Sequence, residues 1–501
     1  MANLKRFRLV VVLTVTGALL SQSMANQGSV TPPAPYGSVP SPRQLDHAKL
    51  ETYAFIHFTV NTFTDREWGL GNEDESVFDP SHFDADQIVL SLKAAGLKGA
   101  VLTCKHHDGF CLWPTATTSH NVSKSKWLNG KGDVVKAISD ACKRHGLKFG
   151  VYVSPWDRNN AKYGKPEYVD LYRAQVTELL THYGPIFEVW HDGANGGTGY
   201  YGGANENRSI ERRTYYDWPT TWDLVRKLQP DANVFSDIGP DLRWVGNEEG
   251  HAAETSWATY DPAGLDHDAA APGYSDYQNA PEGTPHGKQW LPAECDVSIR
   301  PGWFWHAAEN GRVKSPDELF DLYTKSVGRG ASLILNVPPN REGRVDDADV
   351  KSLAGFGEVL RQTFRHNLAD HAHLTASNVR GNAHAFEARA LLSTDPKRYW
   401  ATDDAVTSGS VEIDLGGDKS FDLIRLREPI KYGQRIEAFA MDAWKDGAWK
   451  EIATATTIGN CRILKLKEAV RTSKVRLRVE KSPAAILLYG FGLYQQAKSV
   501  G

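Results

Sequence analysis

Several features that mark common classes of protein are scarce in this sequence. The net charge is only −4 over 501 residues, so no strongly charged surface for nucleic acid or acidic lipid is indicated. The five cysteines are an odd number without the spacing of a zinc motif. Cys104 and Cys111 could form a disulfide across the loop between them, or stay buried thiols. Beyond the N-terminal region no apolar run is long enough to span a membrane.

The N-terminus has the pattern of an export signal. Lys5, Arg6 and Arg8 precede an apolar stretch over residues 9–20, and Ser23-Met24-Ala25 offers small residues for cleavage. We therefore predict a signal peptide over residues 1–25 and an exported protein, periplasmic or secreted. Residues 26–44 form a proline-rich lead-in that we expect to be extended.

Residues 45–365 alternate between short apolar runs and helical patterns. The apolar runs lack clean alternation, as is typical of strands buried on both faces. Helices are predicted from Asp84 to Gly96, from Val134 to His145 and from Pro166 to Tyr183. Asp84, Asp133 and Pro166 mark the three starts, and Gly146 closes the second helix. The six strands predicted are 55–60, 99–104, 149–154, 187–190, 233–237 and 332–337.

The repeat of strand and helix predicts a (β/α)8-like barrel of the α/β class. An open doubly wound sheet is the alternative, but no glycine-rich phosphate loop follows the first predicted strand. After residue 370 the pattern changes to short alternating strands separated by turns such as Gly416-Gly417-Asp418 and Lys445-Asp446-Gly447. We therefore predict an all-β sandwich over residues 370–496, with strands at 411–415, 423–426, 436–441, 463–466, 475–479 and 486–489.

Titratable and aromatic residues cluster where the predicted barrel strands end. Asp192 follows the apolar run 187–190 and precedes a glycine, which is how a barrel of this class presents an acid at its mouth. Glu294 and Asp296 are expected to end a further apolar stretch in the same way. Other residues placed at this mouth are His57, Glu67, Trp68, His106, His107, Tyr152, Trp190, Asp237 and Glu248.

Two chemistries suit a mouth that is rich in carboxylate, histidine and tryptophan. Glycoside hydrolysis requires two carboxyl groups, one of which protonates the leaving oxygen. Metal-assisted hydrolysis would use His57, His106, His107 or Asp192 as ligands. No His-x-His or His-x-x-x-His pair occurs in this stretch, and tryptophan rings pack well on the C–H faces of sugars. We therefore favour sugar chemistry without a metal or cofactor.

The motifs at these strand ends resemble a known family. Glu67-Trp68-Gly69, the run Lys105 to Phe110, Trp190-x-Asp192-Gly193 and the run Leu335 to Asn340 are similar to the α-L-fucosidases of glycoside hydrolase family 29. The resemblance covers residues 45–365. Residues 243–248 and 298–304 resemble the subgroup that cleaves α-1,3- and α-1,4-linked fucose from branched, Lewis-type oligosaccharides. The resemblance implies a retaining mechanism with a covalent fucosyl–enzyme intermediate.

The resemblance also implies roles for individual residues. Asp192 would be the nucleophile and Glu248 the acid/base, 5–5.5 Å apart as in retaining enzymes generally. Glu249, Glu254 and above all Glu294 are the rival acid/base candidates. Arg243 and Arg300 are either contacts to the remainder of the glycan or members of buried ion pairs. The residues expected to contact the sugar are His57, Glu67, Trp68, His106, His107, Tyr152, Trp190 and Trp303, with Glu294 as a further candidate; core packing is the alternative for the two tryptophans Trp190 and Trp303.

Three further expectations concern the rest of the chain. The segment Asp395 to Asp404 weakly resembles discoidin or coagulation factor 5/8 C-type sandwiches, which often bind carbohydrate. Residues 193–216 are long and rich in glycine and tyrosine, as suits a sugar-contacting lid. The expected partner is a fucosylated oligosaccharide or glycoconjugate, and the sequence leaves the oligomeric state open. A different retaining glycosidase and a non-catalytic fucose-binding protein are the alternative functions.

Overall fold

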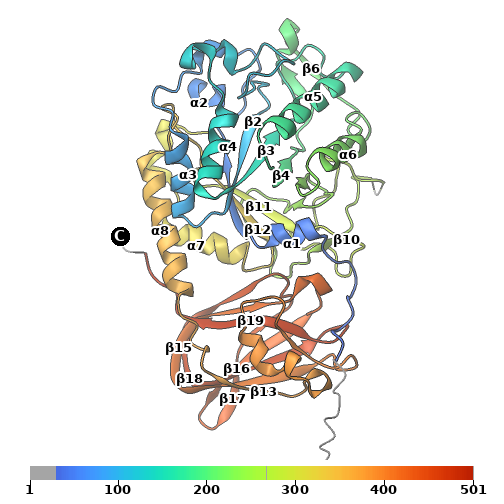
Figure 1. Cartoon of the computed structure of the whole chain (residues 1–501), viewed down its shortest axis with the longest axis vertical. Helices are drawn as coiled ribbons and strands as arrows, with labels where there is room; N and C mark the ends of the chain where they lie inside the picture. The colour runs from blue at the N-terminus through green and yellow to red at the C-terminus, as the bar shows by residue number, and fades with distance from the viewer. Residues whose placement is uncertain (1–29, 267, 500–501) are drawn as a thin grey trace, which may run out of the picture. The chain divides into compact units, whose positions relative to one another are not determined.

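The computed structural model describes residues 30–266 and 268–499 (Figure 1). The predicted signal peptide, residues 1–25, therefore lies outside the described residues. Within the described part, none of the helices combines the length and apolar character that crossing a membrane requires.

Eight parallel strands form a nearly closed barrel. The strand order is β7-β4-β3-β2-β1-β12-β11-β8, so the first and last strands of the domain are neighbours, with Thr52 opposite Leu333. A single parallel bridge between Phe235 and Leu242 links the two ends of the sheet. The strands are β1 (Thr52–Ile56), β2 (Gly99–Lys105), β3 (Lys148–Val153), β4 (Glu188–Trp190), β7 (Asn233–Phe235), β8 (Arg243–Trp244), β11 (Ala293–Ser298) and β12 (Ser332–Asn336).

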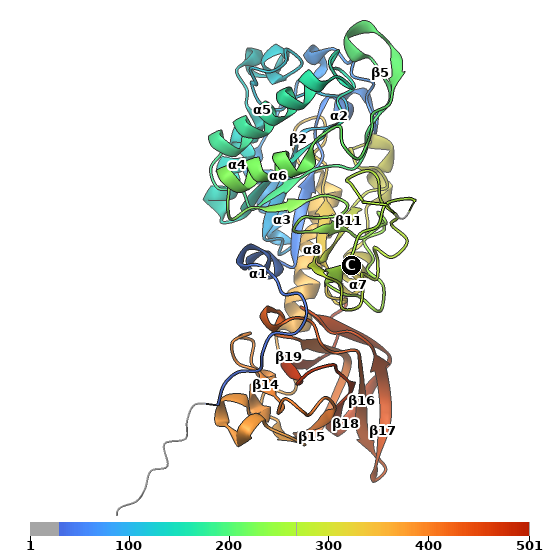
Figure 2. The same ribbon diagram turned by 90° about the vertical axis from the view of Figure 1, so that its right-hand side faces the viewer.

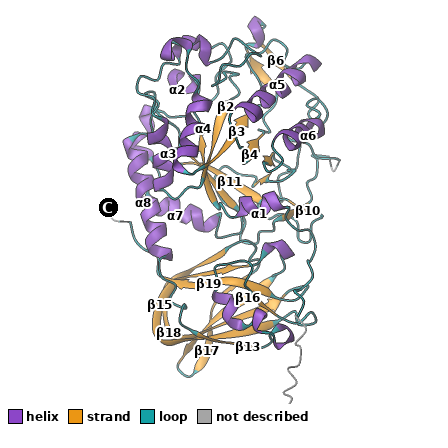
Figure 3. Ribbon diagram, in the orientation of Figure 1, coloured by secondary structure: helices purple, strands orange, loops and turns teal. Residues whose placement is uncertain are grey.

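Helices surround this sheet (Figure 3). Asp84 and Asp133 cap α3 and α4, each accepting a backbone N–H from the first helical turn, and Gly146 ends α4 in a left-handed conformation. These caps were predicted from the sequence. The helices are α1 (Pro42–Ala48), α2 (Val60–Thr64), α3 (Ala85–Ala94), α4 (Val134–His145), α5 (Pro166–His182), α6 (Trp218–Leu228), α7 (Pro316–Lys325) and α8 (Asp347–Phe364).

Two long connections depart from the regular strand–helix repeat. Residues 193–217, between β4 and α6, form a small hairpin of β5 (Gly197–Gly199) and β6 (Glu206–Arg208). The described residues between β8 and β11 contain only the short strands β9 (Thr259–Tyr260) and β10 (Gln289–Trp290). Both connections follow the C-terminal ends of barrel strands, which is where this fold places its functional loops.

The C-terminal part is an antiparallel β domain, as predicted. Its seven strands follow the order β14-β19-β15-β18-β16-β17, with β13 also paired to β15. Figure 2 shows β15, β16, β17 and β18 side by side. The strands are β13 (His373–Ala376), β14 (Trp400–Ala401), β15 (Gly409–Arg427), β16 (Ala438–Lys445), β17 (Ala448–Ala455), β18 (Arg462–Lys481) and β19 (Leu487–Tyr494).

The strand boundaries of this domain differ from the prediction in one instructive way. Two pairs of predicted short strands are each one long strand, β15 and β18. The expected break at Gly416-Gly417 is instead a register shift in the pairing of β15 with β18, because glycine also permits a bulge inside a strand. The hairpin turn predicted at Lys445-Asp446-Gly447 does connect β16 to β17.

Two arginines that were considered for the mouth, Arg243 and Arg300, make their contacts in the interior instead. Arg243 donates to the backbone carbonyls of Ala280 and Trp257, at 3.1 Å each. Arg300 forms a bidentate ion pair with Asp349 of α8, with Nη2 donating to Oδ2 at 2.7 Å and Nε to Oδ1 at 3.1 Å, and both side chains are fully buried. The alternative of buried pairing is therefore correct for Arg300. The five cysteines are buried and unpaired, so Cys104 and Cys111 are thiols here.

The Arg300–Asp349 pair gives a stability prediction. An Arg300→Met variant would leave the Asp349 carboxylate buried without its partner, and we expect the free energy of unfolding to fall by about 3–5 kcal/mol. Urea titration followed by intrinsic fluorescence measures this loss. Arg361→Met, which removes an arginine from an exposed pair with Glu358, is the control and should leave the midpoint unchanged. Equal midpoints for the two variants would contradict the prediction.

Candidate active site

The barrel strands bring a ring of polar side chains together at their C-terminal ends. His57 follows β1, His106 and His107 follow β2, and Tyr152 lies near the end of β3. The ring of His106 is 4.2 Å from that of His107, 5.6 Å from that of His57 and 5.8 Å from that of Tyr152. Asp192 follows β4 and accepts a hydrogen bond from the Tyr152 hydroxyl. These five residues therefore line one site.

The Asp192 carboxylate is held by donors on two sides. Its Oδ2 accepts from Tyr152 at 2.9 Å and its Oδ1 accepts the backbone N–H of Ala194 at 2.7 Å. Burial raises the pKa of Asp192, and these two hydrogen bonds oppose that shift. The side chain is still 23% exposed. Asp192 is thus an oriented carboxylate that a bound molecule can reach.

The three histidines are neutral. Burial lowers the pKa of His57 and of His107 to about 3, and that of His106 well below its usual value. The Ser154 hydroxyl donates to the carbonyl of Trp156, so it accepts a hydrogen from Nδ1 of His107 at 2.7 Å. Nε2 of His107, 3.9 Å from Asp192, is then a lone-pair acceptor. This arrangement suits a ligand that offers hydroxyl hydrogens.

The hydrogen bonds of Asn336 fix the tautomer of His57. The Asn336 amide donates its N–H groups to Ser298 and to the carbonyl of Trp303. Its oxygen therefore accepts from Nδ1 of His57, at 2.8 Å, which leaves Nε2 of His57 as an acceptor. The role of Asn336 in orienting a histidine was not predicted, since nothing in the local sequence pairs β12 with β1.

Glu67, Trp303 and Glu248 are joined by hydrogen bonds. Glu67 accepts the backbone N–H of Trp303 at 2.8 Å and a ring nitrogen of His306 at 2.6 Å. The Trp303 indole donates to Glu248 at 3.2 Å, and its ring centre is 5.2 Å from that of His57. The structure therefore places Glu248 on the same side of the barrel as the histidines. The spacing expected between Asp192 and Glu248 stays a prediction.

The two remaining tryptophans differ in exposure. Trp68 is 52% exposed and its ring lies 5.0 Å from that of His107, so it can stack on a ligand. Trp190 is buried, and it stacks on Phe235 at 4.0 Å and on Tyr152 at 5.3 Å. Direct contact of Trp190 with a ligand therefore stays a prediction, whereas its contact with the barrel interior is clear.

The expectation that Glu294 follows the end of a strand is wrong. Glu294 is the second residue of β11 and is almost completely buried. Its carboxylate accepts the Trp190 indole N–H at 2.7 Å and the Tyr53 hydroxyl. Asp296 also lies within β11 and accepts the Trp244 indole N–H. The apolar run before Glu294 precedes the strand, so Glu294 points into the barrel rather than out of its mouth, whereas Asp296 lies near Glu248.

A third carboxyl group lies beside Asp192. Asp237 accepts the backbone N–H of Gly273 at 2.7 Å and the hydroxyl of Tyr277. Burial raises the pKa of Asp237 to about 6. A side chain at Gly193 would collide with this carboxylate, since a Cβ there would lie 2.2 Å from its oxygen. Tyr277 was not anticipated because it comes from the irregular connection between β8 and β11.

The residues at the mouth do not form a metal cluster in the part of the chain that the structure describes. Among all the described residues, the one group with metal-ligating geometry is His47, Glu188 and Glu294, which lies in the barrel interior. His57, His106, His107 and Asp192, the ligands considered for metal-assisted hydrolysis, are not such a group.

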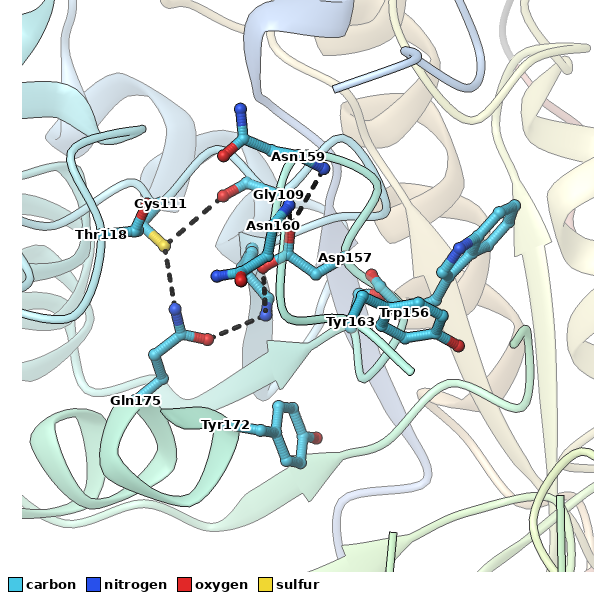
Figure 4. Close-up of polar contacts among 12 residues, drawn as sticks. Gly109, Cys111, Thr118, Trp156, Asp157, Asn159, Asn160, Tyr163, Tyr172 and Gln175 are labelled. Atoms are coloured by element: carbon cyan, nitrogen blue, oxygen red, sulfur yellow. Dashed lines mark hydrogen bonds and ion pairs between the residues drawn. The ribbon is translucent and has the colours of Figure 1, made fainter. Parts of the chain in front are cut away.

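A buried lysine supports the loop that follows β3. Lys105 lies 3.3 Å from Asp157 and donates to Gln175 at 2.8 Å, while Gln175 donates in turn to Cys111 (Figure 4). Asp157 also accepts the backbone N–H groups of Asn159 and Asn160 (Figure 4). The Lys105–Asp157 pair therefore fixes the start of this loop. Removing either partner would leave the other as a buried charge without a counter-charge.

Arg158, next in this loop, connects three segments around the mouth. Its backbone N–H donates to the carbonyl of His107 at 3.0 Å. Its guanidinium donates to the carbonyl of Gly69 at 2.6 Å, beside Trp68, and to that of Thr198 in β5 at 2.7 Å. Residues 193–216, which we expected to act as a lid, are therefore held at their hairpin to the loop after β3.

Comparisons with known proteins agree with this geometry. Residues 41–363 match the family model described as alpha-L-fucosidase. The chain is 40% identical to alpha-L-fucosidase 1 of Arabidopsis thaliana over 95% of this chain and 91% of that protein. The chain belongs to the α-L-fucosidase family. This is glycoside hydrolase family 29, a family of retaining glycosidases.

Solved structures extend the comparison to the whole fold. A glycoside hydrolase 29 family member from an unknown rumen bacterium is 40% identical, with a TM-score of 0.82 over 93% of this chain and 79% of that chain. A family 29 fucosidase of Ruminococcus gnavus, solved with fucose, is 32% identical, with a TM-score of 0.84 over 94% and 98% of the two chains. Residues 373–490 match the F5/8 type C domain, which bears out the resemblance seen for the sandwich.

The Arg158 contacts give a prediction about the loops of this family 29 site. Arg158→Met removes two buried donors, so the free energy of local opening should fall by about 1–3 kcal/mol in the segments that lose them. We expect faster amide hydrogen exchange at residues 66–71 and 197–203 and no change in β1 or β2. Lys162→Met, an exposed change in the same loop, is the control. Unaltered exchange in both segments would show that Arg158 does not hold them.

Proposed function

We propose that this protein is an exo-acting α-L-fucosidase that releases terminal fucose with retention of configuration. The observation that carries the proposal is the Asp192 carboxylate, held by Tyr152 and Ala194 but open to a ligand among three neutral histidines. A carboxylate so held is a suitable nucleophile, because it is oriented and its two donors favour the ionised form. No metal or cofactor is required for this chemistry.

In the proposed mechanism, Asp192 attacks the anomeric carbon and forms a covalent fucosyl–enzyme intermediate. Glu248 gives its proton to the departing glycosidic oxygen and then removes a proton from the attacking water. Glu248 is exposed and bonded to the Trp303 indole. A glycan lying against it would exclude bulk water from the proton transfer.

The rival acid/base candidates fit less well. Glu294 lies inside the barrel with both oxygens bonded to donors. Glu254 is 82% exposed beside Arg329, and Glu249 is 81% exposed beside His251. Neither has a contact to the residues around Asp192. Glu248 is connected to them through Trp303, whose ring lies beside His57.

The acceptor nitrogens of His57 and His107 suit the hydroxyl groups of fucose, and exposed Trp68 offers a stacking surface for its apolar face. We further propose α-1,3- or α-1,4-linked fucose on branched oligosaccharides as the substrate. This preference rests on the resemblance of residues 243–248 and 298–304 to the subgroup with that specificity. Export is likewise proposed from the N-terminal pattern, and N-terminal sequencing of the mature protein should find a start after Ala25.

The function is tested by fucose release from a Lewis-type trisaccharide and from a simple aryl fucoside. We expect the wild type to act on the trisaccharide and little on the aryl fucoside. Asp192→Ala should lower kcat by about 10⁴-fold or more, because the covalent step is lost. Glu248→Ala should lower release from the trisaccharide by about 10²–10⁴-fold, and Glu249→Ala, its exposed neighbour, should not.

Azide distinguishes the nucleophile role of Asp192 from the acid/base role of Glu248. It should restore turnover of Glu248→Ala with retained configuration, because azide replaces the water that the missing base activates. With Asp192→Ala, azide would attack in place of the nucleophile and give inverted product. No release from either substrate by folded wild type would contradict the fucosidase proposal. Fucose binding without turnover would then favour a binding protein, and release of another sugar would favour a different glycosidase.

A further inference from the structure

The interior of the barrel contains a second group of ionisable side chains, separate from the mouth. His47 of α1, Glu188 of β4 and Glu294 of β11 are all buried, and their oxygen and nitrogen atoms lie within 4.8 Å of one another. A ring nitrogen of His47 is 2.9 Å from Oε2 of Glu188. Glu294 accepts from Trp190 at 2.7 Å and from Tyr53. Two acids thus share a site with few counter-charges.

If both acids were ionised, one of their four carboxylate oxygens would lack a hydrogen bond. Glu294 has a donor on each oxygen, but no residue that the structure describes donates to Oε1 of Glu188. A carboxyl oxygen of Glu188 lies within 4.8 Å of one of Glu294, a separation at which two buried carboxylates repel each other. A proton on Glu188 removes the difficulty, since Oε1 becomes a donor to Glu294 while Oε2 still accepts from His47.

We infer that Glu188 is a neutral carboxylic acid in the folded enzyme, and that it donates to Glu294 so that Glu294 can hold the indole of Trp190. Glu188 is then a positioning residue. Trp190 stacks on Tyr152 at 5.3 Å, and Tyr152 donates to the proposed nucleophile Asp192. The hydrogen on Glu188 therefore supports the nucleophile through two aromatic side chains.

The surrounding charges agree with a neutral Glu188. Burial raises the pKa of Glu188 to about 8, and burial together with the nearby Glu188 raises that of Glu294 well above its usual value. Burial lowers the pKa of His47 to about 4, so His47 supplies no positive charge at neutral pH. Asp241 adds further negative charge, although it is paired with Arg43 and Arg226.

The other charged neighbour is a lysine, Lys148 at the start of β3, and it acts on His47, whose pKa it lowers. Tyr53 of β1 is the remaining titratable group, and its pKa is raised well above the usual value by burial. A metal ion is the alternative to a proton. Both oxygens of Glu294, however, already face hydrogens from Tyr53 and Trp190, so a cation would first have to displace these donors.

The pH dependence of stability distinguishes a neutral from an ionised Glu188. An unfolded glutamic acid has a pKa of about 4.3, below the folded value of about 8. The stability contributed by the protonated form is therefore complete below the unfolded pKa, and it is lost as the pH rises from there to the folded pKa. A Glu188→Gln variant keeps a donor and an acceptor but does not titrate, so it is not subject to this loss.

We would measure the melting temperature of wild type and Glu188→Gln from pH 5 to pH 8. We expect similar values at pH 5 and a growing advantage for Glu188→Gln toward pH 8. Groups outside this cluster titrate alike in both proteins and cancel in the difference. A difference that stays constant over this range would show that Glu188 is ionised in the fold and overturn the inference. One equivalent of metal in the purified wild type, by elemental analysis, would also overturn it.

The positioning role rests on the proposed function and is tested by kinetics. Glu188→Met removes the donor to Glu294, and we expect kcat to fall by about 10-fold with little change in KM. Glu188→Gln should restore kcat to within about twofold of wild type, which a purely steric role would not predict. Equal kcat values for the two variants would contradict the positioning role. If wild type released no fucose, the function would fail, but the melting comparison would still report on the proton.

Discussion

The cost of burying charge is the constraint on which most of this structure depends. A barrel of eight parallel strands is packed on both faces, so an ionised side chain inside it must be paired, bonded to several donors or made neutral. The chain uses all three solutions. Arg300 is paired with Asp349 and Lys105 with Asp157. Asp192 has an N–H and an O–H donor, and the histidines near it are neutral.

This constraint divides the barrel into two electrostatic regions. At the mouth, Asp192 stays partly exposed, so water and donors can support an anion. In the interior, the described residues offer Glu188 and Glu294 no cationic partner, since the pKa of His47 is low, and a proton on Glu188 completes their hydrogen bonds. Trp190 and Tyr152 lie between the two regions. Trp190 and Tyr152 thus connect Glu294 to the nucleophile through hydrogen bonds and ring stacking, so that the interior acid does not lie beside Asp192.

Much of the fold could be predicted from the sequence because its signals are local. Apolar runs gave six of the eight barrel strands to within a few residues, and Asp84, Asp133 and Gly146 marked helix ends through caps that span one turn. The strand ends also located Asp192, His57 and His107, since parallel strands share one carboxyl edge. Glu294 was misplaced because its apolar flank precedes β11 and belongs to the connection. A buried acid held by Trp190 and Tyr53 leaves no periodic pattern in the sequence.

What the sequence could not provide was the set of contacts between distant segments. Arg158 links the Trp68 loop to β5, Asn336 fixes the tautomer of His57, and Trp303 connects Glu67 to Glu248. Each contact joins residues tens to hundreds of positions apart and depends on the closed barrel.

These contacts also explain why the two proposed catalytic acids can differ in character. Asp192 is oriented by the strand framework before any sugar binds, whereas Glu248 lies on an exposed loop and has one indole donor. The glycan that covers Glu248 must then exclude water from its surroundings. Substrate contacts beyond the fucose ring would therefore act on catalysis as well as on binding, because they supply the desolvation that an acid catalyst needs.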